Sequence, residues 1–156
     1  IPGIQAFLQI FDQLLNFAAA LNTWYYSGHK PEGYFDYQLP PMEAIRNQKP
    51  VLWTWPSQLL LMTPNFVQAS ALQQLLAEYD TAAQPAIYLQ SFQEGKCIQL
   101  LHAGAFGTEA GSLQHLSKYA AVGSLRLSDH LHEIYLNDPR EVAPEEMRRV
   151  LRWGVR

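Results

Sequence analysis

The sequence predicts an α+β fold in which one domain is built from two similar halves. Its 156 residues match the length of an ordinary domain, and 48% are hydrophobic while only 16% are charged. Segments with helical periodicity alternate with short segments whose apolar residues recur at every second position. Each half contains a predicted helix followed by two strands, so we place the modules at about residues 1–80 and 81–156 of a single domain, 1–156.

The first predicted element is a helix from Ile4 to Trp24. Apolar residues recur at three- and four-residue steps on one face, while Gln5, Gln9 and Asp12 follow the other. Such a polar stripe does not fit a lipid-facing span, so we expect a soluble protein with no membrane partner. Gly28 follows the helix and favours its termination.

Two strands and a second helix are predicted to complete the first half. The strands cover Tyr34–Leu39 and Val51–Met62, and Pro56 indicates a bulge or an edge position in the second. Thr63-Pro64 is a typical helix start. The segment DTAAQP at 80–85 is the predicted boundary between the halves.

The second half is predicted to start with a hairpin. Its strands, Ala86–Phe92 and Lys96–His102, are joined by Gln93-Glu94-Gly95. A helix then begins near Thr108 and ends at Gly123. The remaining predicted elements are a strand at His130–Leu136, a short helix from Pro144 and a last strand at Val150–Arg156.

Charge and cysteine content exclude several classes of function. Eleven Lys and Arg against fourteen Asp and Glu give a net charge of −3, without the cation clusters that bind phosphates, so nucleic acid is not an expected partner. Cys97 is the single cysteine, which excludes an internal disulfide and a cysteine-rich zinc site. We expect a cytoplasmic protein without a secretion signal. The chain starts at Ile1 rather than Met, so we also expect residues before it.

Glu133, within the segment HLHEIYL at 130–136, is the most informative residue. Strand periodicity places Leu131, Glu133 and Tyr135 on one face, and His132 on the other. A carboxylate in an apolar strand either lies on a solvated face or is buried with a partner, because an unpaired buried charge is costly. Both alternatives remain open at this stage.

Aromatic residues provide possible walls for a pocket around such an acid. Trp53 and Trp55 share one strand face, Phe35 and Tyr37 share another, and Tyr135 lies beside the acid. Aromatic walls and a carboxylate suit a bulky organic cation. The alternative is that these residues simply pack in the core.

Three other groupings are weaker. His130 and His132 have a metal-binding spacing but lack an evident third ligand, so no metal or other cofactor is expected. Cys97 and His102 are separated by five positions and face opposite sides of a straight strand. Ser112 lacks the second glycine of a nucleophile elbow.

Several segments together resemble the GyrI-like small-molecule-binding family in its bacterial stand-alone form. The resemblance covers most of the chain from about residue 10 and is strongest in the second half. It is carried by EGKCIQLLH at 94–102, AGAF at 103–106, HEIYLNDPR at 132–140 and APEEMRRVLRWGVR at 143–156, and upstream by YFDYQLPPME at 34–43 and WTWPSQLLLMTPNF at 53–66.

The resemblance implies two strand-helix-strand-strand modules, related by a pseudo-twofold axis, that hold a ligand between them. It also implies a strand before the first helix, and lipophilic, often cationic or aromatic ligands. Relatives serve as effector-binding domains for many drugs, but no DNA-binding helix pair is visible here. The implied ligand-binding residues are Glu133, Tyr135, Trp53, Trp55, Tyr37, Glu43 and Phe106.

Some relatives are hydrolases that open cyclopropanoid rings, which gives an alternative function. The implied catalytic residues are Glu133, with Glu43 as a second acid and Tyr37 or Tyr135 as proton donor. A carboxyl in an apolar pocket suits acid–base chemistry near neutral pH. Phe106 stands where the family pattern often has tyrosine, and Arg46 would oppose a cationic ligand if it faced inward. Ligand binding is therefore preferred, followed by hydrolysis, and then by a fold that only makes protein contacts.

Overall fold

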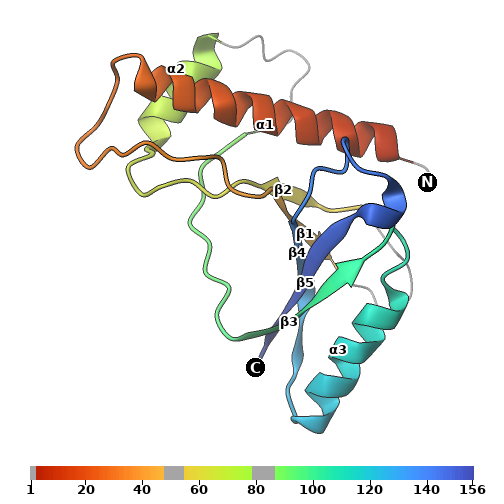
Figure 1. Ribbon diagram of the computed structural model, residues 1–156. Coiled ribbons are helices and arrows are strands. Elements are labelled where there is room, and N and C mark those ends of the chain that lie inside the picture. The colour runs from red at the N-terminus through yellow and green to blue at the C-terminus, as the bar shows by residue number, and fades with distance from the viewer. Residues whose placement is uncertain (1–2, 48–54, 79–86) are drawn as a thin grey trace.

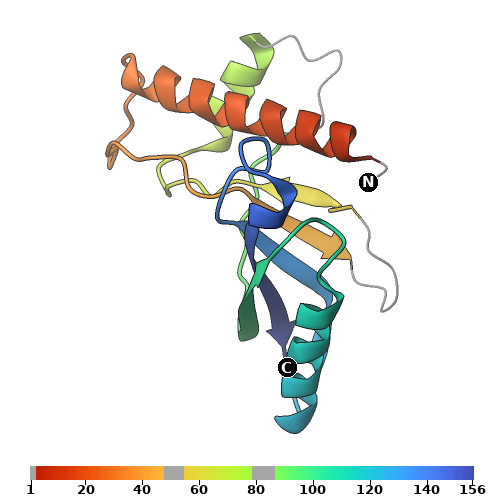
Figure 2. The same ribbon diagram turned by 45° about the vertical axis from the view of Figure 1, so that its right-hand side comes forward.

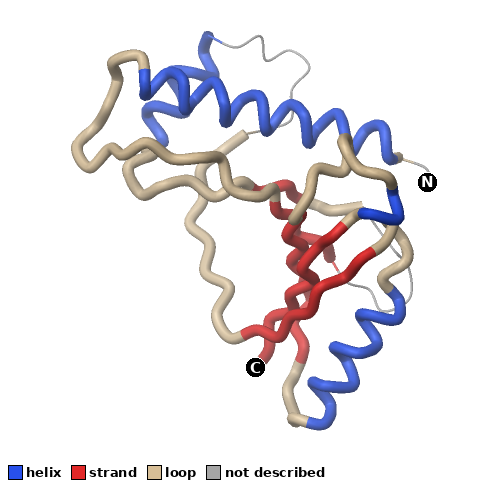
Figure 3. The backbone as a smooth tube through the Cα atoms, viewed as in Figure 1, coloured by secondary structure: helices blue, strands red, loops and turns tan. Residues whose placement is uncertain are grey.

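The computed structural model describes residues 3–47, 55–78 and 87–156 and shows an α+β fold (Figures 1 and 3). In these residues, helices and strands alternate along the chain, and the strands join in a single antiparallel sheet. The elements are α1 (Ile4–Tyr26), β1 (Glu43–Asn47), β2 (Gln58–Leu60), α2 (Ala69–Glu78), β3 (Cys97–Ala103), α3 (Ala110–Val122), β4 (Leu127–Tyr135), the 3₁₀ turn η1 (Pro144–Glu146) and β5 (Arg148–Val155).

The strand order β2-β1-β4-β5-β3 joins the two halves of the chain at the β1–β4 pair. All neighbouring strands are antiparallel, with Ala44 opposite Glu133 and Glu133 opposite Leu151. The α+β class is therefore confirmed. Each half has a helix followed by two strands, but the pseudo-twofold relation between modules stays a prediction.

The two faces of the sheet have different surroundings. Ala44, Glu133 and Leu151 lie on what we name the helix face, because α1 packs over Ala44 and α3 packs over Leu151. Ile45, His132 and Arg152 project from the other side, which we name the open face. The turned view in Figure 2 separates α1 at one end of the sheet from α3 along its side.

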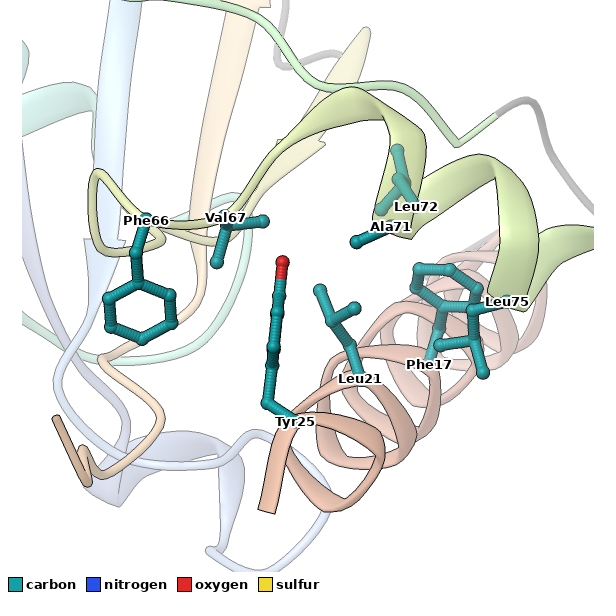
Figure 4. Packing of buried hydrophobic residues seen from close by; sticks show 8 residues of the cluster. All are labelled: Phe17, Leu21, Tyr25, Phe66, Val67, Ala71, Leu72 and Leu75. Atoms are coloured by element: carbon teal, nitrogen blue, oxygen red, sulfur yellow. The ribbon is translucent and has the colours of Figure 1, made fainter. Parts of the chain in front are cut away.

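Helix α1 begins and ends close to its predicted bounds, and its apolar stripe is buried in two clusters. Its first half joins the cluster that contains Tyr135, whereas its second half packs on α2 and the segment at Phe66–Val67. Figure 4 shows Tyr25 pointing from α1 toward Val67, and the Gln68 amide donates to its hydroxyl over 3.4 Å. By length and composition alone α1 could cross a membrane, and one of its faces packs in the two clusters.

The structure corrects the predicted first half. Tyr34–Leu39 is a loop rather than a strand, because Tyr34 and Tyr37 pack on Phe66 instead of pairing with the sheet. The first sheet strand is β1, which the sequence analysis missed. Of the predicted strand Val51–Met62 the structure shows β2, whereas residues 51–54 lie outside the described part. The second helix begins at Ala69, after a turn at Asn65–Phe66, not at Thr63-Pro64.

The predicted hairpin in the second half is wrong. Residues 87–92 form no strand, and β3 pairs with β5 instead. The segment 87–96 runs along the open face, where Phe92 lies against His132 with ring centroids 5.5 Å apart. The bounds of α3, β4 and β5 agree with the prediction to within a few residues, whereas the boundary expected at 80–85 lies outside the described residues.

Candidate functional site

Glu133 is buried in the centre of the sheet and is paired with two arginines. Its side chain projects from β4 onto the helix face and is about 2% exposed. Arg46 Nη2 lies 2.6 Å from Oε1, and Arg149 Nη1 lies 3.4 Å from Oε2. Of the two alternatives left open by the sequence, the structure therefore shows the buried acid with partners. These partners are cations, so the surroundings are not the purely apolar pocket expected.

Arg149 connects Glu133 to a second buried acid. Its Nη2 lies 2.6 Å from Oε1 of Glu109 and donates to the carbonyl oxygen of Ala105 over 3.3 Å. Burial is the largest single effect on Glu109 and disfavours its charged form, but the charge of Arg149, a backbone hydrogen bond and the charge of Arg46 together lower the pKa of the carboxyl. Two arginines thus face two glutamates, and the formal charges of this buried cluster cancel.

Tyr135 lies two residues beyond Glu133 on the same face. Its hydroxyl donates to Oε2 of Glu133 over 3.1 Å. Burial, followed by the nearby negative charge of Glu133, raises the pKa of Tyr135 well above its ordinary value. The phenol therefore keeps its proton over the whole physiological pH range and remains a hydrogen-bond donor.

Aromatic rings enclose Tyr135 from three other parts of the chain. We name Phe7, Phe11, Trp55, Phe106 and Tyr135 the aromatic shell. The ring centroids of Phe106 and Tyr135 are 6.1 Å apart, and the Arg149 guanidinium lies over the Phe106 ring, 4.7 Å from its centroid. Phe7 stacks on Trp55 at 5.0 Å. A side chain at Gly3 would collide with the Trp55 indole, which shows how closely α1 approaches this shell.

The shell is closed by its own side chains. Phe7 lies 5.3 Å from Phe106 and 6.0 Å from Tyr135, and Phe11 meets Tyr135 edge-on at 5.9 Å. Two hollows on the described surface lie elsewhere, around Phe66 and the end of α1. The open cleft between modules that the resemblance implies is therefore not shown, and a ligand at Glu133 requires the shell to part.

The structure brings together some predicted site residues and separates others. Glu133, Tyr135, Trp55 and Phe106 share the helix face or its aromatic shell. Tyr37 instead packs with Phe66 in the cluster beside α2, with ring centroids 5.8 Å apart. Trp53 lies outside the described residues.

Glu43 lies on the opposite face from Glu133, because Ala44 is the residue that pairs with Glu133 across β1 and β4. Its Oε2 accepts a hydrogen bond from Nε2 of His132 over 2.7 Å, and Glu94 contacts Nδ1 of the same ring. Burial lowers the pKa of His132, but the hydrogen bonds to both acids outweigh it, so the pKa is raised. We name Glu43, His132 and Glu94 the open-face triad.

Arg149 and Glu109 are the members of the buried site that the sequence analysis missed. Arg149 had one usable signal: it occupies a position of β5 where alternate residues, Leu151 and Trp153, are apolar and buried. A cation at such a position requires an acid on the same face. Glu109 gave no comparable signal, since it precedes α3 in a loop whose path only the fold determines.

No protein-family model and no curated protein matches this chain. Solved structures do match. A hydrolase from Listeria innocua is 26% identical, with a TM-score of 0.73 over 96% of this chain and 79% of its own. A second hydrolase from that organism is 24% identical, with a TM-score of 0.77 over 96% and 80%, and an uncharacterized conserved protein from it is 26% identical at 0.71. The fold is therefore one adopted by proteins described as hydrolases.

Proposed function

We propose that this protein is a hydrolase of a neutral, lipophilic small molecule, with Glu133 as general base and Tyr135 as hydrogen-bond donor. The observation that carries the proposal is the 3.1 Å hydrogen bond between these two groups inside an aromatic shell. Support comes from the similarity to the 26% identical Listeria hydrolase. The resemblance to the GyrI-like family, in which tyrosine and glutamate act together, points to the same pair.

The arrangement suits activation of water. Arg46 and Arg149 fix the orientation of the Glu133 carboxylate. In the proposed reaction this carboxylate accepts a proton from the attacking water. Tyr135 keeps its own proton, and its hydroxyl would turn from Glu133 to donate to a substrate atom that gains negative charge. The guanidinium of Arg149 adds a fixed positive charge to the same end of the site.

The two arginines also favour a neutral substrate over a cation. The sequence predicts a lipophilic ligand that is cationic or aromatic, and a cationic ligand requires Glu133 to be an acid without a cation beside it. With Arg46 at 2.6 Å and Arg149 at 3.4 Å, that negative charge is already paired, and a cation would meet two like charges. A neutral aromatic molecule that carries a strained ring, such as a cyclopropanoid, would fit the aromatic shell and would not meet the two cations as a like charge.

The place of Glu133 in the sheet fits the two-module arrangement. It lies on the β1–β4 pair, where the halves of the chain meet, and the family's ligand is held between its modules. Entry requires Phe7 and Phe11 to move away with the first half of α1. We propose that this half of α1 covers the site and opens for substrate.

The test is incubation with a cyclopropanoid substrate and detection of a product heavier by one water. We expect turnover by the wild type, and a rate lower by roughly 100-fold or more in Glu133→Gln, because a general base contributes about that much. Glu94→Gln is the matched control, since it removes a carboxylate from the open face. Absence of product, while a positive-control enzyme is active, would contradict the proposal, as would equal rates in both variants.

Binding without turnover is the second candidate, and Phe106 favours it. This ring lies in the aromatic shell but lacks the hydroxyl that the family pattern often supplies. Quenching of tryptophan fluorescence by a neutral aromatic dye, with no product formed, would support binding alone. Rhodamine is the cationic comparison, and we expect it to bind more weakly than a neutral dye of similar size.

A further inference from the structure

A serine, a histidine and a threonine form a separate polar cluster at the start of α3. His102 is the one buried residue of β3, and its Nδ1 lies 3.0 Å from the Ser112 hydroxyl oxygen. Its Nε2 lies 3.2 Å from the Thr108 hydroxyl oxygen. His102 is buried, Ser112 is half-buried and Thr108 is exposed, so the cluster runs from the core to the surface.

The hydrogen-bond directions in this cluster are determined by Thr108. Its hydroxyl donates to the carbonyl oxygen of Ala105 over 2.8 Å, so its one proton is used. The Thr108 oxygen must then accept from Nε2–H of His102. In a neutral ring the other nitrogen, Nδ1, carries a lone pair, and the Ser112 hydroxyl donates to it. A serine that donates to a neutral imidazole is the starting arrangement for an activated hydroxyl.

The surroundings of His102 keep the ring neutral. Burial, and then the positive charge of Arg149, lower its pKa, and Arg46 acts in the same direction. Glu109 and Glu133 act in the opposite direction but do not outweigh them. These are the charged groups that approach the ring from β1, β4, β5 and the start of α3.

The surface of α3 is open beside Ser112, at the exposed Gly111. Ser112 lies in the first turn of α3, and its neighbour Gly111 has open space where a side chain would project. Glu109, at the N-cap position, makes no side-chain cap to this turn and instead bonds the Gly107 amide and Arg149. Amides of a first helical turn point outward and stabilise negative charge.

Gly104 allows the loop to close around the histidine. Its φ is +137°, and an added side-chain carbon would lie 3.0 Å from the Thr108 oxygen and 3.5 Å from Nε2 of His102. A residue without a side chain at this position therefore lets Thr108 reach the ring. The backbone conformation at Gly104 is therefore needed for the hydrogen bond by which Thr108 orients the His102 ring.

We propose that Ser112 is a nucleophilic serine and His102 its general base, in a second site that cleaves activated carboxylic esters of small acids. Ser112 Oγ bonds to the ester carbonyl carbon as its proton passes to Nδ1 of His102. The bond to the alcohol oxygen then breaks, and the alcohol leaves with that proton. Water attacks the acyl-serine, gives one proton to Nδ1 and releases the acid, and the proton returns to Ser112. This activity is separate from the one proposed for Glu133.

The first test is labelling with a fluorophosphonate, which replaces its fluoride by a serine oxygen. We expect one adduct by intact mass, on the peptide that contains Ser112. Labelling should be lost in Ser112→Ala and reduced at least tenfold in Thr108→Val, which removes the acceptor for Nε2–H. Ser57→Ala is the matched control, because that hydroxyl donates to the Ile45 carbonyl instead of an imidazole.

The second test measures release of p-nitrophenol from p-nitrophenyl acetate. The rate should be lost in Ser112→Ala, retained in Ser57→Ala, and half-maximal below pH 6.5, the ordinary value for histidine. Circular dichroism establishes that each variant is folded. Folded wild type that gains no adduct overturns the proposal, and so does labelling or ester cleavage that persists in folded Ser112→Ala.

Discussion

The two faces of the sheet bury charge in different ways, although neighbouring residues of β4 carry both arrangements. On the helix face, Glu133 is held by Arg46 and Arg149, whose charges do not change in the physiological pH range. On the open face, the adjacent His132 is held by Glu43 and Glu94. One cluster therefore depends on permanent cations and the other on a cation that can lose its proton.

The difference in cover between the faces matches this difference in chemistry. Arg149 and Glu133 lie beneath helices and aromatic rings and are almost completely inaccessible. Glu94 belongs to a segment without secondary structure, and its side chain is 21% exposed. An acid buried as deeply as Glu133 needs a permanent cation beside it, whereas water reaches Glu94 in the open-face triad directly.

The largest effect should follow removal of the cation from the helix face. Arg149→Met leaves Glu109 without its partner and Glu133 with only one arginine. We expect a loss of about 3–5 kcal/mol in the free energy of unfolding, because the acids are left buried and uncompensated. Urea unfolding at neutral pH measures it.

Arg148→Met is the matched control, because this neighbouring side chain of β5 is exposed, and its effect should stay within about 0.5 kcal/mol. Adding Glu109→Gln to Arg149→Met should recover part of the loss by removing one uncompensated charge. Equal effects at positions 148 and 149 would show that the buried cluster contributes no more than a surface arginine.

A smaller, pH-dependent effect is expected on the open face. The pKa of His132 is raised in the folded chain, so its contribution to stability is fully present below the unfolded value near 6.5 and is lost as pH rises through the folded value. The wild type should lose about 1–2 kcal/mol relative to His132→Gln over that range, which corresponds to hydrogen bonds to a charged group. Urea unfolding from pH 5.5 to 9 measures the difference.

Glu94→Gln sharpens this prediction, since it removes one of the two acids while the Glu43 bond remains. We expect the loss of unfolding free energy between pH 5.5 and 9 to be smaller in Glu94→Gln than in the wild type. The part of this loss that His132 causes should be absent in His132→Gln. If the wild type and His132→Gln keep a constant difference across the range, the open-face triad is not a protonated cluster.

The sequence predicted best those elements whose residues contain the information locally. Helix α1 has a stripe that persists for more than 20 residues, and α3 ends at a glycine, so periodicity and termination agreed with the structure. It failed for β1, whose Glu43 and Arg46 are charged but buried through partners on β4. It also failed for residues 87–92, which alternate like a strand but lie across the sheet.

The same reasoning explains how much of the candidate site was predictable. Glu133 and Tyr135 were placed on one face because strand periodicity is a local property. Arg149 and Glu109 join them only through the register of β5 and the loop before α3. The register of β1 on β4 pairs Ala44, not Glu43, with Glu133. Because a difference of one residue exchanges the faces of a strand, Glu43 lies on the opposite face from Glu133.

The smallest effect is expected from the exposed ion pairs that join α1 to the loop after β4. Arg140 contacts Asp12 of α1 and Asp138 of its own loop, and these groups are partly accessible to solvent. Arg140→Gln should lower the free energy of unfolding by less than about 1 kcal/mol at low salt, and by less again when salt is added, because water and ions screen such pairs. Urea unfolding with and without salt measures it. A loss as large as that of Arg149→Met would mean that α1 is held by this ion pair rather than by Phe7 and Phe11, and the contrast between buried and exposed charge would then fail.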